Sequence, residues 1–127
     1  MAATYTLKVV TDFAASHILH GHTGKCRNLH GHNWGVEVEV KAHALNEIGM
    51  AIDFQDIKAA VKALVDQLDH RHLNDLPAFE GINPTAEHIA RHMHGALSQQ
   101  LNTEGVRVHA VTIWETPRCC VRYTEEP

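Results

Sequence analysis

The sequence predicts an α+β fold in which an antiparallel four-stranded sheet carries two helices on one face. Apolar and polar residues alternate near both ends of the chain, two stretches between them have helical periodicity, and turn-forming residues separate these segments. The predicted order is strand, strand, helix, helix, strand, strand. Because the helices are not interleaved between strands, an antiparallel sheet is favoured over a parallel one. We expect residues 1–127 to form a single domain without an internal repeat or linker.

The first two strands are predicted from residues that alternate in polarity. The first covers residues 4–14, where Tyr5, Leu7 and Val9 share one face. The second covers residues 33–44, where three valines alternate with three charged residues: Val36, Val38 and Val40 against Glu37, Glu39 and Lys41. Residues 17–31 are rich in glycine and histidine and are expected to form a loop. A turn is expected at residues 46–49.

Two helices are predicted in the middle of the chain. The first begins after Asp53, a suitable N-cap, and ends with Leu68-Asp69-His70. Its apolar stripe consists of Phe54, Ile57, Val61, Leu64, Val65 and Leu68. After a polar loop with Asn74, Asp75 and Pro77, the second begins near Pro84-Thr85, with proline in its first turn. Its stripe consists of Ile89, Met93, Leu97 and Leu101.

The last two strands follow a loop that ends at Gly105. Residues 106–115 alternate again and predict a strand. One face of this strand is expected to carry Val106, Val108, Ala110 and Thr112, and the other face Val111 and Ile113. Residues 119–124 can form the final strand.

Composition excludes several classes of function. The net charge is −4 and no run of lysine and arginine exists, so we expect no nucleic-acid partner. No apolar stretch approaches the ~20 residues that span a membrane, and the first ten residues do not resemble a secretory signal. The three cysteines, of which Cys119 and Cys120 are adjacent, make a poor disulfide framework and indicate a reducing cytoplasm.

His30-Gly31-His32 is the sharpest local feature in a chain with twelve histidines. In an extended segment these two side chains point to the same side, with Cα atoms roughly 6.6 Å apart, and can converge on one metal ion. His17 is the best third ligand, because it lies where the first strand ends and antiparallel pairing returns it to the pair. Three histidines leave one position of a tetrahedral zinc ion open, which is typical of a catalytic site.

Two other histidine pairs compete for this role. His88 and His92 are four residues apart on the second helix, but the residue after His88 is not glutamate, so the zinc-protease motif is absent and a solvated helix face is favoured. His20 and His22 lie in the glycine-rich loop without a defined partner and are the main alternative ligands.

Cys26 lies between Lys25 and Arg27, four residues before His30. Two adjacent cations and a nearby metal favour the thiolate form. The thiolate can act as a base, a nucleophile or a fourth metal ligand, and the alternative is an inert buried cysteine.

Two carboxylates are further candidates. Asp69 beside His70 suggests a proton relay, although adjacent residues do not face each other on a helix and the pair also suits a simple helix terminus. Glu115 follows Trp114 at the end of a largely apolar strand. It can anchor the N–H groups of a ligand or be an exposed strand end.

These features together resemble the 6-pyruvoyltetrahydropterin synthase family, and more closely its bacterial branch of 6-carboxytetrahydropterin synthases in queuosine biosynthesis. The three residues between Cys26 and His30 match that branch. The resemblance covers nearly the whole chain, and the segments that carry it are Phe13 to His17, Cys26 to His32, Gly49 to Phe54, Leu68 to Asn74, Asn83 to Glu87 and Trp114 to Thr116.

The resemblance implies the tunnelling fold (T-fold), in which subunits join their sheets into a barrel. It implies a homo-oligomer, commonly a hexamer, with active sites at subunit interfaces. The implied Zn²⁺ ligands are His17, His30 and His32. The implied catalytic residues are the base Cys26, the relay pair Asp69 and His70, and Glu115. The implied substrate-binding residues are Glu115, which binds the pterin ring, Thr85 and Glu87.

The implied substrate is 7,8-dihydroneopterin triphosphate, converted to 6-carboxy-5,6,7,8-tetrahydropterin with release of acetaldehyde and triphosphate. The alternatives are 6-pyruvoyltetrahydropterin synthase activity and a non-catalytic zinc- or pterin-binding module. The resemblance assigns no role to His20, His22, Cys119 or Cys120.

Overall fold

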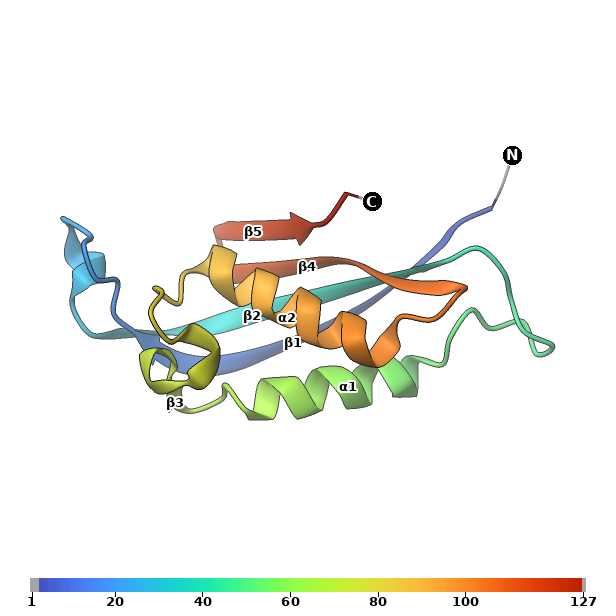
Figure 1. Cartoon of the computed structure of the whole chain (residues 1–127), viewed down its shortest axis with the longest axis horizontal. Coiled ribbons are helices and arrows are strands. Elements are labelled where there is room, and N and C mark those ends of the chain that lie inside the picture. Colours follow the sequence, from blue (N-terminus) through green and yellow to red (C-terminus); the bar gives the residue numbers. More distant parts are fainter. Residues whose placement is uncertain (1–2, 127) are drawn as a thin grey trace.

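Two helices lie on one face of a five-stranded sheet in this computed structural model, which describes residues 3–126 except the side chain of Cys26 (Figure 1). The sheet order is β3-β1-β2-β4-β5. The strands are β1 (Tyr5–His17), β2 (His30–Ala42), β3 (Arg71–His72), β4 (Val106–Thr116) and β5 (Cys119–Thr124). The helices are α1 (Phe54–Asp66) and α2 (Ala86–Leu101). The predicted α+β class and the order of its main elements are confirmed.

The fifth strand corrects the prediction of a purely antiparallel four-stranded sheet. β3 has two residues and runs parallel to the end of β1, pairing Arg71 with Ala15 and His72 with Ser16. A two-residue strand is too short to produce a detectable alternation of polarity. β3 forms because the chain after α1 runs beside β1, where the amide of His70 donates to the carbonyl of Ala14 at 2.6 Å.

The β1–β2 hairpin is longer than predicted. β1 continues to His17 and β2 begins at His30, so the expected loop at residues 17–31 is wrong at both ends. The register is continuous from Tyr5 opposite Ala42 to His17 opposite His30. Polar and glycine residues occupy this end of the hairpin, so the hydrophobic pattern did not reveal its strands.

The helix starts follow the predicted capping chemistry, but one helix end differs. The carboxylate of Asp53 accepts from the amide of Gln55 at 2.8 Å, and the hydroxyl of Thr85 accepts from the amide of His88 at 3.1 Å. Pro84 precedes this second cap and is not in the first turn. α1 ends at Asp66, before the predicted end at His70. No helix in residues 3–126 is both long and apolar enough to cross a membrane.

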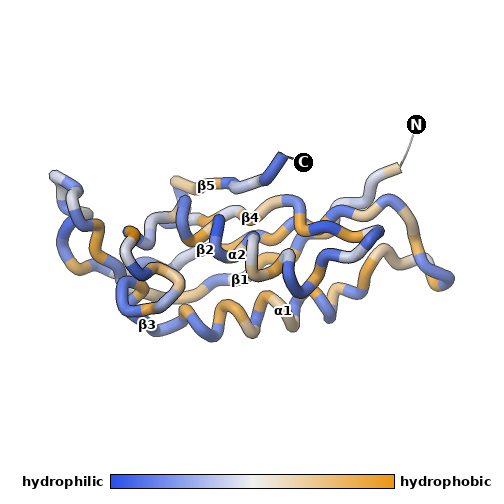
Figure 2. Tube along the Cα trace, viewed as in Figure 1, coloured by the Kyte–Doolittle hydropathy of each residue, from blue (hydrophilic) through white to orange (hydrophobic). Residues whose placement is uncertain are grey.

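The core lies between the helices and one face of the sheet. Figure 2 shows hydrophobic residues recurring along α1 and the strands. A bulge opposite Glu39 and Val40 shifts the β2–β4 register, so Val108 faces the helices together with Val111 and Ile113, and not opposite them as predicted. Phe54 is 46% exposed and does not belong to the buried stripe. The largest fully buried apolar side chains are Trp34, Phe79, Ile57, Leu68, Leu73, Ile89, Met93, Leu97 and Ile113.

The helix-free face of the sheet carries charge pairs. Lys8 contacts Glu37 at 3.0 Å, and Arg122 contacts Glu39 at 2.9 Å. Val10 of β1 is 66% exposed, whereas Val38 of β2 is fully buried under the helices. Neighbouring strands therefore hold the same residue type in opposite environments.

This contrast predicts unequal effects of one substitution. Val38→Ala is expected to lower the free energy of unfolding by about 2 kcal/mol, because it leaves a cavity in the core. Val10→Ala, the matched control, is expected to change it by no more than about 0.5 kcal/mol. Urea-induced unfolding of both variants measures the difference, and equal losses would contradict this assignment of faces.

Candidate metal centre

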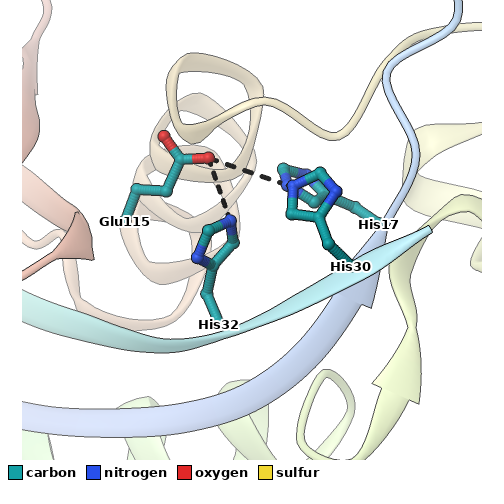
Figure 3. A group of neighbouring side chains, drawn as sticks. All are labelled: His17, His30, His32 and Glu115. Carbon is teal, nitrogen blue, oxygen red and sulfur yellow. Dashed lines mark hydrogen bonds and ion pairs between the residues drawn. The ribbon is translucent and has the colours of Figure 1, made fainter. Parts of the chain in front are cut away.

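Three histidine side chains meet where β1 ends and β2 begins (Figure 3). His17 is directly opposite His30, and His32 lies two residues further along β2. The period of two in extended chain sets His30 and His32 on the same face as His17. The ring centroid of His17 lies 4.4 Å from that of His30 and 5.3 Å from that of His32. The predicted trio is therefore brought together.

Backbone carbonyls determine which ring nitrogen of His17 and His30 carries the proton. Nδ1 of His17 lies 2.8 Å from the carbonyl oxygen of Pro84, and Nδ1 of His30 lies 2.6 Å from that of Asn28. A carbonyl only accepts, so each Nδ1 donates and each neutral ring presents the lone pair of Nε2. These two Nε2 atoms face each other at 2.8 Å. Two lone pairs at this distance are stabilised by a cation between them.

Glu115 of β4 completes a four-residue group. Its carboxylate lies 3.2 Å from Nε2 of His32 and 3.7 Å from Nε2 of His17 (Figure 3). One ligand atom from each of His17, His30, His32 and Glu115 lies within 4.8 Å of the others. The donors of a tetrahedral ion with bonds of about 2.0–2.1 Å are about 3.3 Å apart, so this group fits a metal ion.

The donor atoms suit zinc and related ions. Imidazole binds zinc, copper, iron and nickel, and carboxylate is a common additional ligand. Among the described residues, Nε2 of His32 is buried without a hydrogen-bond partner, and a metal ion would supply a partner. Desolvation by burial lowers the pKa of His17 and of His32, so both rings are held in the neutral form that binds metal.

Two asparagines fix the chain that follows His17, and sequence reasoning missed them. The side-chain amide of Asn74 accepts from the amide of Ile18 and donates to its carbonyl, both at 2.9 Å. Asn83 makes the same pair of bonds with His20, also at 2.9 Å. Contacts between residues more than fifty positions apart leave no local pattern, so no signal was available.

Asp69 and His70 face each other, contrary to the argument from helical spacing. That argument fails because α1 has already ended and His70 has a φ of 57°. Nδ1 of His70 lies 2.9 Å from one carboxylate oxygen of Asp69, and the other oxygen accepts from the amide of Ala14 at 2.8 Å. This amide, and then His70, hold the pKa of Asp69 below its usual value. In the described part of the chain, no hydrogen bond or ion pair joins this pair to the three histidines.

The remaining predicted site residues are Cys26, Thr85 and Glu87. The side chain of Cys26 lies outside the described residues, but its neighbour Lys25 lines a pocket of about 390 Å³ with His30, His32, Glu115 and Thr116. Thr85 caps α2 and follows Pro84, whose carbonyl holds His17. Glu87 is exposed in the first turn of α2.

The competing histidines lie elsewhere. Nδ1 of His88 is 2.6 Å from the carbonyl oxygen of Asn83, and the ring of His92 packs against Phe79. His20 and His22 are exposed. Among the described residues, the group with Glu115 is the only one that places three or more such ligands together.

This geometry predicts the metal ligands. Wild-type protein is expected to bind about one zinc ion per chain, and His17→Ala or His30→Ala to lose most of it, because two imidazoles cannot replace the full ligand set. His88→Ala serves as the control and should keep the metal. Equilibrium dialysis with elemental analysis measures the stoichiometry. A zinc site emptied by His88→Ala, and retained in His30→Ala, would contradict this ligand set.

Similarity to known proteins extends over the whole fold. Residues 6–126 match the protein-family profile described as 6-pyruvoyl tetrahydropterin synthase. The 6-carboxy-5,6,7,8-tetrahydropterin synthase of Haemophilus influenzae is 31% identical, with 90% of this chain and 94% of that protein covered. The protein of the same name from Synechocystis is 39% identical, with 88% and 87% covered.

A solved structure has the same fold. The Caenorhabditis elegans 6-pyruvoyl tetrahydropterin synthase superposes with a TM-score of 0.87 at 28% identity, and the match covers 98% of each chain. The T-fold expected from the sequence is therefore confirmed. The family profile, the relatives and this structure agree, and the chain belongs to the 6-pyruvoyl tetrahydropterin synthase family.

Proposed function

We propose that this protein is a zinc-dependent carbon–carbon lyase that converts 7,8-dihydroneopterin triphosphate to 6-carboxy-5,6,7,8-tetrahydropterin. The observation that carries the proposal is the group of His17, His30, His32 and Glu115 on the fold of this family. Relatives named for this carboxylated product, at 31% and 39% identity, favour it over other pterin products. We further propose that it acts in the cytoplasm and supplies the queuosine pathway.

The reaction balances without a redox cofactor. One side-chain carbon remains on the pterin ring as the carboxyl group, two leave as acetaldehyde, triphosphate departs, and one water is consumed. The ring gains the two electrons that the side chain loses. The protein therefore needs only to hold the substrate, polarise it and move protons.

The metal would be held by His17, His30 and His32, which present Nε2 from two paired strands. Bound zinc supplies a Lewis acid that polarises side-chain oxygens of the substrate and acidifies the neighbouring carbon-bound protons. The carbonyls of Pro84 and Asn28 fix two of the three rings and keep their Nε2 lone pairs directed into the group.

Cys26 is proposed as the base that removes a proton from the substrate side chain. It lies in the short helical turn Lys25–Arg27, and Lys25 lines the pocket in front of the histidines. Two flanking cations favour the thiolate that this role requires. The pterin side chain is proposed to enter this pocket, which Lys25, His30 and His32 line.

Asp69 and His70 are proposed to relay protons. Because Nδ1 of His70 donates to Asp69, Nε2 is left to accept or return a proton. Asp69 remains ionised because the amide of Ala14 and the ring of His70 both stabilise its carboxylate. The pterin ring is proposed to bind through Glu115, with Thr85 and Glu87 also contacting substrate.

A homo-oligomer with interface active sites, most simply a hexamer, completes this proposal. The side chain of His70 is 83% exposed and has no described contact with the three histidines. Most of β1 is an open sheet edge, because β3 pairs only with Ala15 and Ser16. Phe54 at the start of α1 is 46% exposed and lines a pocket beside this edge. An open edge next to exposed apolar surface favours pairing with another copy.

Product analysis tests the proposed reaction. Zinc-loaded protein incubated with 7,8-dihydroneopterin triphosphate is expected to release acetaldehyde and 6-carboxy-5,6,7,8-tetrahydropterin in equal amounts, because both come from one cleavage. Chromatography of the pterins and an aldehyde assay measure them. Pyruvoyl product without acetaldehyde would support 6-pyruvoyltetrahydropterin synthase activity, and an unchanged substrate would support a non-catalytic binding module.

The role of Cys26 has its own test. Cys26→Ala is expected to lower turnover at least about a hundredfold, since positioned general bases contribute roughly that factor or more. Zinc content and pterin affinity should be retained, because neither depends on the base. Cys120→Ala, which removes an exposed cysteine on β5, is the matched control. Unchanged turnover in Cys26→Ala would exclude the cysteine as the base.

A further inference from the structure

We propose that a cavity at the far end of the sheet from the metal centre binds a small molecule with one phosphate or carboxylate group and a hydroxyl or amino group. The three histidines lie where β1 ends and β2 begins, whereas this cavity lies where β2 ends and β4 begins (Figure 1). Its volume is about 230 Å³. This binding site is independent of the reaction proposed above.

Two cations lie next to each other in the lining of this cavity. Lys41 of β2 is directly opposite Arg107 of β4 in the antiparallel register, and both line the cavity. Cβ atoms of directly opposite residues are about 4.5–5.5 Å apart, and like charges in such positions repel each other. Lys41 is half-buried, and neither side chain makes an ion pair or a side-chain hydrogen bond with a described residue. A bound anion would replace this repulsion by two attractive contacts.

The nearest carboxylate on the same strand already has a partner. Glu39 is two residues before Lys41 on the same face of β2, but both of its oxygens accept from the guanidinium of Arg122, at 2.9 and 3.1 Å. His109 also lines the cavity, and burial, followed by the charge of Lys41, lowers the pKa of its ring. This histidine is therefore held neutral, and the positive charge of this part of the cavity belongs to Lys41 and Arg107.

A buried histidine of α2 lines the same cavity. The side chain of His94 is 7% exposed, and both of its ring nitrogens are buried without a hydrogen-bond partner among the described residues. A neutral imidazole offers one donor and one acceptor. The carboxylate of Glu125 lies 3.9 Å from Nδ1, which is too far for a hydrogen bond, and accepts from the hydroxyl of Tyr123. A ligand hydroxyl or amino group between His94 and Glu125 would bond to both.

Size and charge restrict the ligand further. The volume lies below the range of about 300–1,000 Å³ that is typical of sites for drug-sized ligands, so a nucleotide or a pterin triphosphate is too large. The carboxylates of Glu104 and Glu126 also line the cavity. Their charge disfavours a ligand with several anionic groups, whereas Lys41 and Arg107 can hold one. The ligand is therefore small, with a single anionic group and a hydrogen-bond donor.

Titration calorimetry of the zinc-loaded protein with glycerol 3-phosphate and with lactate, at constant ionic strength, tests this site. At least one probe is expected to bind saturably, and the stronger of the two identifies the anionic group. Lys41→Met and Arg107→Met should each raise the dissociation constant at least about tenfold, because each removes a charge-assisted hydrogen bond. Lys62→Met, which removes an exposed charge on α1, is the control and should match wild type. No saturable binding, or wild-type affinity in both cavity variants, would overturn the proposal.

A second titration separates this cavity from the metal centre. His30→Ala, which removes a predicted metal ligand, is expected to bind the probe as wild type does. Loss of binding in this variant would place the probe at the metal centre and overturn the proposal.

The role of His94 is tested by comparing each probe with a counterpart that lacks the hydroxyl, which is inorganic phosphate or acetate. Wild type is expected to bind the hydroxylated probe about fivefold more tightly, since one hydrogen bond contributes roughly that factor. His94→Leu should remove this difference while the counterpart binds as before. Equal affinities of wild type for the probe and its counterpart would overturn the role of His94.

Discussion

The antiparallel register that sets His17 opposite His30 is the constraint on which the rest of the site depends. In a strand pair, a shift of one residue moves every side chain to the other face of the sheet. A shifted β1 would bring Ser16 opposite His30, and His17 would leave the helix side. The register is fixed by apolar packing next to the site and beyond it, because Val9 and Phe13 of β1 pack in the same core as Val38 and Trp34 of β2. The hydrophobic core thus determines the position of the metal group.

Burying imidazoles at the end of an apolar core requires partners for their nitrogen atoms, since an unpaired buried polar group costs about 1–3 kcal/mol. The loop before α2 supplies one, because the carbonyl of Pro84 accepts from His17. Asn74 and Asn83 tie the chain after His17 to the same region through four hydrogen bonds. Among the described residues, Nε2 of His32 is buried without a hydrogen-bond partner, and the carboxylate of Glu115 lies 3.2 Å from it. A metal ion held by this group would supply the bonding that the described side chains leave incomplete.

The sequence was sufficient where the signal is local or periodic. His30 and His32 are two residues apart, and the strand ending at His17 returns to them through one hairpin, so the trio was predictable. Glu115 was predicted as a site residue but not as a neighbour of the histidines, because its position depends on a third strand and a bulge that alternation cannot reveal. A second bulge, between β2 and β4, misled the assignment of Val108. Adjacency suggested a relay of Asp69 and His70 but left it open, because their contact requires the left-handed backbone of a non-glycine residue.

The relation between His70 and the metal group explains why the proposed site extends beyond one chain. Asp69 is bonded to the amide of Ala14, which is three residues before His17 on β1. Three residues of extended chain cover about 10 Å, and β1 lies between β2 and β3 in the sheet. The bond to Ala14 therefore holds Asp69 about 10 Å along β1 from His17. No described hydrogen bond or ion pair joins Asp69 or His70 to the three histidines. A relay fixed in this way can act on a substrate only if the substrate bridges that gap or if it serves the metal group of a neighbouring copy. An open β1 edge and an exposed His70 favour the second arrangement, in which assembly and catalysis depend on the same edge of the sheet.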